Sequence, residues 1–122
     1  MYPVDYPSIT LGGRTFVVRY SLAAQIILVR SGIDPQQLRF LLNKDEPRRV
    51  ENLIKLFAAC VAENFIDQTK PHECDLRAAW TADFWMTQVQ VSDISAIDKV
   101  LGESMGKVTE ALKNRATEPP AL

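Results

Sequence analysis

The most regular pattern of apolar and polar positions lies between Pro47 and Phe65. Apolar residues recur there at three- and four-residue steps, at Val50, Leu53, Ile54, Phe57, Ala58, Val61 and Phe65. This spacing places them on one face of an α-helix, and polar residues such as Asn52 fall on the opposite, solvent-facing side. Pro47 suits the first turn, and Glu51 and Lys55 form a favourable charge pair four residues apart. We expect this helix to be the central packing element.

Residues 8–20 alternate between apolar and polar positions, which predicts a β-hairpin. Ile9 and Leu11 alternate with polar neighbours in the first strand, and Gly12 and Gly13 supply the positive φ angles of a tight turn. One face of the return strand carries Phe16, Val18 and Tyr20. A two-stranded ribbon alone is marginal in water, so we expect the hairpin to lie on the helices that follow.

Two shorter helices are predicted between the hairpin and the central helix. Ser21 suits the cap of a helix over residues 22–31, which Gly32 ends. Its broad apolar surface includes one side made of Leu22, Ile26 and Val29. Asp34 and Pro35 form a second start signal, for a short helix over residues 35–43. We expect the inward-facing residues of that helix to be Leu38, Leu41 and Leu42.

Two further helices are predicted after an irregular surface loop over residues 66–78. Thr81 suits the cap of a short helix over residues 82–89, and Ser92 suits that of a long helix over residues 93–115. The long helix carries a narrow apolar stripe at Ile94, Ile97, Leu101, Met105, Val108 and Leu112. Gly102 and Gly106 interrupt this helix, and each costs about 0.5–1 kcal/mol relative to alanine.

These elements predict a mainly α fold, a compact helical domain of about five helices with one N-terminal β-hairpin. The length of 122 residues suits a single domain over residues 1–122, and we expect its ordered part to be residues 8–113. Hydrophobic residues make up 47% of the chain and charged residues 24%, which is the composition of an ordinary globular protein and not of a disordered tail.

Charge and hydropathy narrow the classes of partner. The formal net charge of -1 creates no field that attracts phosphate, so we expect no nucleic-acid partner. No apolar run reaches the roughly 18–20 residues of a membrane span, and the N-terminus lacks the basic and apolar regions of a signal peptide. We therefore expect no membrane partner and a cytoplasmic location.

Candidate catalytic chemistry is confined to the loop that holds the single histidine, His72, with Cys74 two residues later. A thiolate nucleophile needs a histidine and an orienting group arranged around it, but side chains this close in an extended loop point apart. The paired spacings of zinc ligands are missing. Gly12 and Gly13 lack the lysine of a phosphate-binding loop. We expect no enzyme activity, no cofactor and no metal.

Apolar residues near the C-terminal end are the better candidates for function. Trp80, Phe84 and Trp85 lie within six residues of one another, and tryptophan anchors protein interfaces well. Phe84 and Trp85 cannot face the same way on a helix. The candidate partner-binding residues are Trp80, Phe84, Trp85, Ile94, Ile97, Leu101, Met105 and Val108. The stripe of the last helix has three alternative uses: packing in its own domain, pairing with a second copy, or lying in a partner's groove.

The order of elements resembles the tail assembly chaperones of long-tailed bacteriophages and the related gene-transfer-agent tail proteins. The resemblance rests on ITLGGRTFVVRYSLAAQIIL, a short leucine-rich helix, the long helix LIKLFAACVAE, a loop, and TADFWMTQVQVSDISAIDKVLGESM, and it covers most of residues 8–112. Its clearest part is an apolar strand, a Gly-Gly turn, a strand ending in Arg19 and Tyr20, and then a helix.

The resemblance implies a helix-rich protein of the host cell cytoplasm without catalytic activity. Such a protein binds the tape measure protein, keeps its apolar segments from aggregating, and helps to recruit tail tube subunits. An alternative in the same setting is a tail completion or regulatory interaction module that self-associates through its C-terminal helix, as a homo-oligomer.

Overall fold

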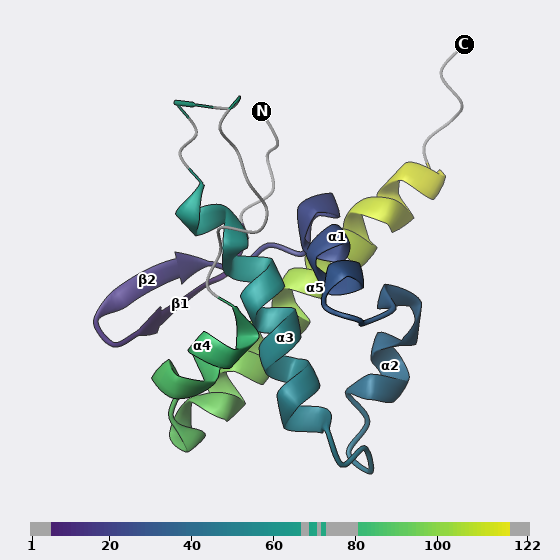
Figure 1. Ribbon diagram of the computed structural model, residues 1–122. Helices are drawn as coiled ribbons and strands as arrows, with labels where there is room; N and C mark the ends of the chain where they lie inside the picture. The colour runs from purple at the N-terminus through teal and green to yellow at the C-terminus, as the bar shows by residue number, and fades with distance from the viewer. Residues whose placement is uncertain (1–5, 67–68, 71, 73–80, 118–122) are drawn as a thin grey trace.

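The computed structural model describes residues 6–66, 69–70, 72 and 81–117, with side chains described as far as residue 106. The elements in chain order are β1 (Ser8–Leu11), β2 (Arg14–Val17), α1 (Leu22–Arg30), η1 (Pro35–Gln37), α2 (Leu38–Leu41), α3 (Arg49–Val61), η2 (Ala62–Phe65), α4 (Ala82–Gln88), η4 (Val91–Asp93) and α5 (Ile94–Thr117), where η denotes a 3-10 helix. The fold is mainly α, with five α-helices and an N-terminal hairpin among the described residues (Figure 1), which confirms the predicted fold class.

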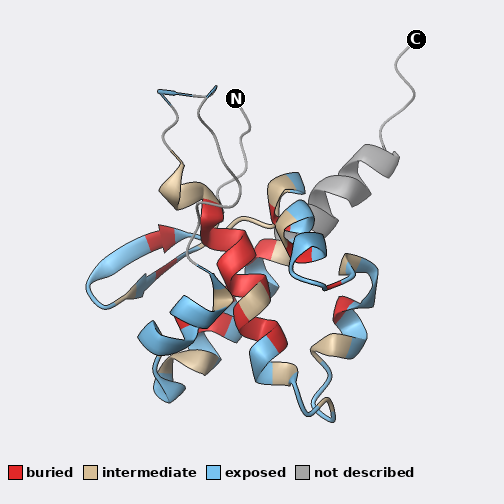
Figure 2. Ribbon diagram, viewed as in Figure 1, coloured by how far each residue is buried: buried red, intermediate tan, exposed pale blue. Residues whose placement is uncertain are grey.

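Helix α3 runs through the middle of the molecule and contacts α1, α4 and α5 (Figure 1). It is buried along most of its length (Figure 2), at Asn52, Leu53, Ile54, Leu56, Phe57, Ala58, Ala59, Cys60 and Val61. Burial on several sides follows from this position, because neighbouring helices cover more than the single face that the spacing predicted. The buried residues of the molecule form one core cluster around α3.

Three details of α3 differ from the prediction. Asn52, predicted to face solvent, is buried, and its side-chain Nδ2 donates a hydrogen bond to the Leu41 carbonyl at 2.9 Å. This bond satisfies a polar group that burial alone would destabilise. Val50, predicted to face the core, is 50% exposed. Pro47 lies outside the helix, because Arg48 occupies the N-cap.

The predicted hairpin is confirmed. Gly12 and Gly13 have φ angles of 59° and 79°, which form the two-residue turn that joins β1 to β2. The strands are antiparallel, with Ile9 opposite Phe16, and both of these side chains enter the core. The outer edge of β2 is closed by the side-chain amide of Asn64, which accepts the Val17 N–H at 2.9 Å and donates to the Val17 carbonyl at 2.7 Å.

Three of the predicted helix caps are present. The side-chain oxygens of Ser21, Asp34 and Thr81 each accept a hydrogen bond from a backbone N–H two or three residues further on, at 3.0–3.2 Å. The predicted Ser92 cap is wrong. The Asp93 carboxylate instead accepts the Gln90 N–H at 3.0 Å, so the helical path begins after Gln90 with η4 and continues into α5.

Only a narrow part of the apolar surface of helix α1 is buried in the core. Ala24 and Leu28 are buried, whereas Leu22 is 74% and Val29 61% exposed. In α2, Leu38 is buried, and the other two residues predicted to face inward, Leu41 and Leu42, are partly buried. Helix α1 therefore leaves a strip of apolar side chains at the surface, made of Leu22, Ile26 and Val29.

Helix α5 is tied to the hairpin by a buried serine. The Ser104 hydroxyl donates to the Val18 carbonyl at 3.0 Å and accepts the Tyr20 N–H at 3.1 Å. Ile97, Val100 and Leu101 are buried on the same side of the helix. This combination fixes the long helix against the end of β2, because a buried hydroxyl is stable only where its donor and acceptor sites are used.

Replacing Gly102 or Gly106 by alanine is expected to stabilise the protein. Both glycines are exposed within α5, and a Cβ atom built on either of them meets nothing within 4 Å. Each substitution should raise the free energy of unfolding by about 0.5–1 kcal/mol, measured by urea denaturation followed by circular dichroism. Gly12→Ala is the control and should destabilise, because φ at Gly12 is 59°. Loss of stability in both α5 variants would contradict this account.

Candidate functional site

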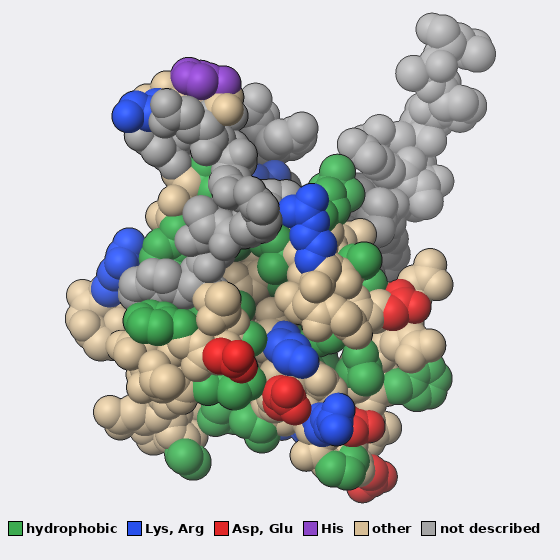
Figure 3. All heavy atoms as spheres, viewed as in Figure 1, with side chains coloured by type: hydrophobic (Ala, Val, Ile, Leu, Met, Phe, Trp, Pro, Cys, Tyr) green, Lys and Arg blue, Asp and Glu red, His purple; other side chains and the backbone are tan. Residues whose placement is uncertain are grey.

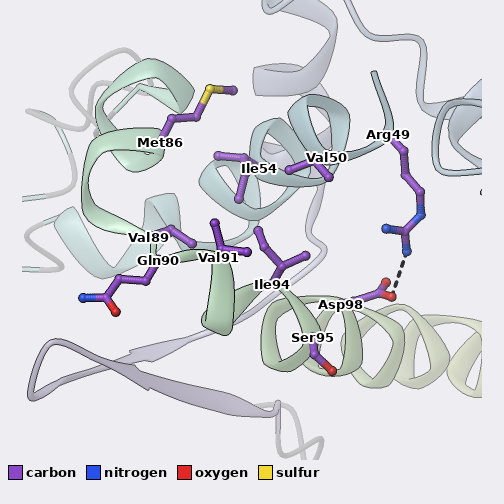
Figure 4. Close-up of a pocket in the computed structure, with 10 residues that line it drawn as sticks. All are labelled: Arg49, Val50, Ile54, Met86, Val89, Gln90, Val91, Ile94, Ser95 and Asp98. Atoms are coloured by element: carbon purple, nitrogen blue, oxygen red, sulfur yellow. Dashed lines mark hydrogen bonds and ion pairs between the residues drawn. The ribbon is translucent and has the colours of Figure 1, made fainter. Parts of the chain in front are cut away.

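An apolar groove lies between the first turns of α3, the C-terminal end of α4, η4 and the start of α5 (Figure 4). Its volume is about 730 Å³, within the range of roughly 300–1,000 Å³ that is typical of binding pockets. The lining residues are Arg49, Val50, Ile54, Met86, Val89, Gln90, Val91, Ile94, Ser95 and Asp98. The groove therefore brings the start of α3 together with the continuous stretch that runs from the end of α4 to the start of α5.

The walls of the groove carry large apolar side chains that solvent reaches. Val50 is 50% exposed, Met86 39% and Val91 91%, whereas Ile54 is buried against the core. Figure 4 shows Val91 between Val89 and Ile94, with Ile54 and Val50 on the facing helix. Apolar surface gathered in a hollow, unlike single exposed apolar residues, is typical of interaction sites.

The backbone between α4 and α5 explains the position of Val91. Helix α4 ends at Gln88. The next residue, Val89, has extended angles of φ -85° and ψ 132°, and Gln90 is extended as well. The Asp93 carboxylate then accepts the Gln90 N–H, and the chain turns into η4. Val91 is the first residue after this turn, where neither α4 nor α5 covers it. Its exposure thus follows from the way in which the two helices are connected.

One end of the groove is polar. Arg49 Nη2 lies 2.9 Å from Asp98 Oδ2, and Arg49 Nε donates to the Leu42 carbonyl at 3.1 Å. This ion pair joins the start of α3 to α5. Arg49 and Asp98 are the charged residues that line the groove, and their charges cancel. The groove consequently favours uncharged apolar side chains. The Asp98 side chain is 51% exposed, so it offers a polar contact at one end of the groove.

Trp85, predicted as a partner-binding residue, lies in the core. It is 1% exposed, and its ring meets those of Phe16 and Phe57 edge-on, with centroid distances of 5.2 Å and 5.1 Å. Phe84 points the other way and is 43% exposed, as expected for neighbours on a helix. Trp85 is therefore a packing residue in this conformation, and Phe84 remains at the surface.

The apolar stripe of the last helix is mostly turned inward. Ile97 and Leu101 are buried, and Met105 is partly buried against the core. Ile94 is partly buried and lines the groove. Of the three alternatives for this stripe, packing in its own domain accounts for Ile97 and Leu101. The predicted residues Trp80 and Val108 lie outside the described side chains.

Sequence reasoning missed Val91 and assigned Val50 to the core. It placed Met86 in the same apolar cluster as Trp80 and Trp85 but not among the partner-binding residues. The signal for Val91 is weak, since a single valine before a helix start is common. Val50 had the spacing of a core residue, because it lies one turn before Leu53 and Ile54. Only the path of α4 and η4 beside α3 shows that these three side chains surround one hollow.

The molecule shows no dominant charge on the face that Figure 3 presents. On the face shown in Figure 3, acidic and basic side chains are interspersed, with apolar side chains between them. Glu51 and Lys55 form the predicted pair on α3, at 3.5 Å. Such a surface gives no long-range attraction to a strongly charged partner.

His72, the single histidine, does not line the groove. His72 is exposed, and Cys74 lies outside the described residues. Among the residues that the structure describes, no three or more His, Cys, Asp or Glu side chains gather where they could hold a metal ion. Cys60 is buried in α3, and burial, together with the negative charge of Glu63, raises the pKa of its thiol to about 12. A thiol in this state is a poor nucleophile.

Stability is expected to depend on Cys60 at alkaline pH. The folded state keeps the thiol protonated up to a pKa of about 12, whereas the unfolded thiol ionises near its ordinary value of 9.0. Between these values the folded state binds more protons, so the free energy of unfolding of the wild type should fall as pH rises. Cys60→Ala should lack this part of the decline when both proteins are followed by urea denaturation at several pH values. Parallel curves would contradict the prediction.

Two further findings concern membrane spans and similar proteins. Within the described part, none of the helices is long and apolar enough to cross a membrane. Comparison of the chain with protein-family models, with curated proteins and with solved structures finds no match.

Proposed function

We propose that this protein is a non-catalytic tail assembly chaperone of a long-tailed bacteriophage or prophage, and that it binds helical segments of the tape measure protein in the groove. The observation that carries the proposal is the set of exposed apolar side chains around one hollow, Val50, Met86 and Val91. The resemblance of the sequence, in its order of hairpin and helices, to this family gives the proposal its biological setting.

The chemistry of the groove favours the apolar face of an amphipathic helix. Such a helix presents apolar side chains at three- and four-residue steps, and a groove between helices accepts them in a row. The groove is open, largely apolar and about 730 Å³ in volume, which provides room for several side chains. In this proposal, Asp98 at the polar end of the groove meets the polar side of the bound helix.

Binding of this kind is sufficient for a holding function. A long helical protein with unpaired apolar faces aggregates before it assembles, and a small protein that covers those faces keeps it in solution. The energy comes from burial of apolar surface at about 25 cal/mol per Å², without nucleotide hydrolysis or covalent chemistry. In this proposal the complex forms in the host cell cytoplasm and then meets the tail tube protein.

Co-expression with the tape measure protein of the same genome tests the proposal. The soluble fraction of the tape measure protein should rise when this chain is present, and the two should co-purify. An unrelated aggregation-prone helical protein serves as the control and should gain little. A tape measure protein whose solubility is the same with and without this chain would remove the main support for the proposal.

A further inference from the structure

Helix α4 is held to the rest of the molecule mainly by one side chain. Trp85 is the buried residue among its 7 residues, Ala82 is partly buried, and the other five side chains are exposed. Isolated helices shorter than about 12–15 residues are marginal in water, because the first turn is costly to form. The stability of α4 therefore depends on the docking of Trp85.

The hydrogen bonds of α4 are local. Between described residues, the Thr81 side chain accepts the Phe84 N–H, and the Thr87 hydroxyl donates to the Phe84 carbonyl, all within the helix and its cap. The neighbouring elements are held differently. The side chain of Asn52 ties α3 to the end of α2, and that of Ser104 ties α5 to the end of the hairpin. Helices α2 and α5 thus have polar links to other elements in addition to their apolar contacts.

The site that receives Trp85 is built without α4. Its rings are Phe16 of β2, Phe57 of α3 and Phe65 of η2, with centroids 5.2, 5.1 and 6.4 Å from that of Trp85. Phe16 and Phe65 also contact each other at 5.9 Å, and the Asn64 side chain joins β2 to η2 by two hydrogen bonds. The three rings therefore have contacts of their own that do not require α4.

We propose that α4 is a movable wall of the groove, which detaches as a unit when Trp85 leaves its aromatic site, while the hairpin, α1, α3 and α5 stay folded. The extended residues Val89 and Gln90 are the hinge, and the Asp93 carboxylate fixes the chain behind them. Detachment takes Met86 out of the groove lining and widens the groove along α3. The movement belongs to the chain alone, whereas its use, to admit a bulkier helix, rests on the proposed function.

Amide hydrogen exchange of the isotope-labelled full chain, followed by NMR, tests the proposal. The Trp85 N–H donates to the Thr81 carbonyl at 3.0 Å and the Val89 N–H to the Trp85 carbonyl at 2.9 Å, so both amides report on α4. They should exchange about 100-fold faster than the amides around Phe57 in the buried middle of α3. Low concentrations of urea should speed their exchange only slightly, because a local opening exposes little surface.

Three replacements separate local opening from unfolding of the whole domain. Leu28→Val weakens α1, which α3 separates from α4 in Figure 1, and should speed exchange in α3 about threefold to tenfold while leaving α4 unchanged. Trp85→Phe weakens the docking of α4 and should speed exchange there about tenfold. Phe84→Ala is the matched control on the exposed side of α4 and should change its exchange less than about threefold.

Equal exchange rates in α4 and in the middle of α3 would overturn the proposal. So would equal acceleration of both by Leu28→Val, because both results mean that α4 opens only when the whole domain unfolds. Fast exchange in α4 that does not respond to Trp85→Phe would indicate fraying of single hydrogen bonds and would overturn it as well. Circular dichroism shows whether each variant is folded. Because no partner is present, the result is separate from any result with the tape measure protein.

Discussion

Replacing Trp85 by alanine is expected to lower the free energy of unfolding by about 3–5 kcal/mol. The side chain is 1% exposed and packs edge-on against Phe16 of the hairpin and Phe57 of α3, so it joins α4 to both. Its removal leaves a cavity that these rings cannot fill without moving. Since domains of this size are stable by roughly 5–15 kcal/mol, the loss should be visible as a large shift of the urea midpoint.

Two variants make the Trp85 prediction specific. Trp85→Phe keeps an aromatic ring in the site and should cost less than Trp85→Ala. Phe84→Ala, on the same helix but at a side chain that is 43% exposed, should change the free energy of unfolding by about 1 kcal/mol or less. If Phe84→Ala proved as damaging as Trp85→Ala, the orientation of α4 described above would be wrong.

The double replacement Val50→Asp and Met86→Asp is expected to weaken binding of tape measure helices about 100-fold, which corresponds to about 3 kcal/mol. Both side chains lie on the groove wall and are partly exposed, at 50% and 39%. In the complex they would place two carboxylates among apolar side chains, where an unpaired charge is strongly unfavourable. Isothermal titration calorimetry with helical peptides from the tape measure protein measures the change.

The matched control for the groove is a double replacement on α1, Leu22→Asp and Val29→Asp. These residues are 74% and 61% exposed, and neither lines the groove. Both double variants should retain the circular dichroism spectrum of the wild type, because the replaced side chains already meet water. Loss of binding in the α1 variant, with binding retained in the groove variant, would show that the partner helix binds to α1 and not in the groove.

Much of the fold could be predicted from local signals. The turn at Gly12 and Gly13 and the caps at Ser21, Asp34 and Thr81 each depend on a few neighbouring residues, and the structure contains all of them. These turn and cap interactions depend on neighbouring residues and not on contacts between distant parts of the chain. For that reason, the order of hairpin and helices could be predicted from spacing and capping residues alone.

The positions that could not be predicted depend on which elements meet. Asn52 has the spacing of an exposed residue, but the Leu41 carbonyl of the preceding helix accepts its hydrogen bond. On α1 the apolar surface is wider than the contact with α3, so Leu22 and Val29 remain outside although their residue type suits a core. Periodicity gives the face of a helix that is apolar, and not the width of the surface that covers it.

The candidate site was only partly visible in the sequence for the same reason. Ile94 was among the residues proposed for partner binding, and it lines the groove. Trp85 and Leu101 had the right chemistry for an interface, yet both pack in the core. Val91 carried no distinguishing signal, because its exposure results from the turn between α4 and η4. A groove made by two distant segments, residues 49–54 and 86–98, has no single continuous motif.

The central claim is that the groove between α3, α4 and α5 is the surface that receives a partner helix. Amide chemical-shift mapping of the isotope-labelled protein, during titration with a helical peptide from the tape measure protein, tests it most directly. We expect the largest shifts at Val50, Ile54, Met86, Val91 and Ile94. Shifts confined to the exposed strip of α1, at Leu22, Ile26 and Val29, or none at all with excess peptide, would contradict the claim.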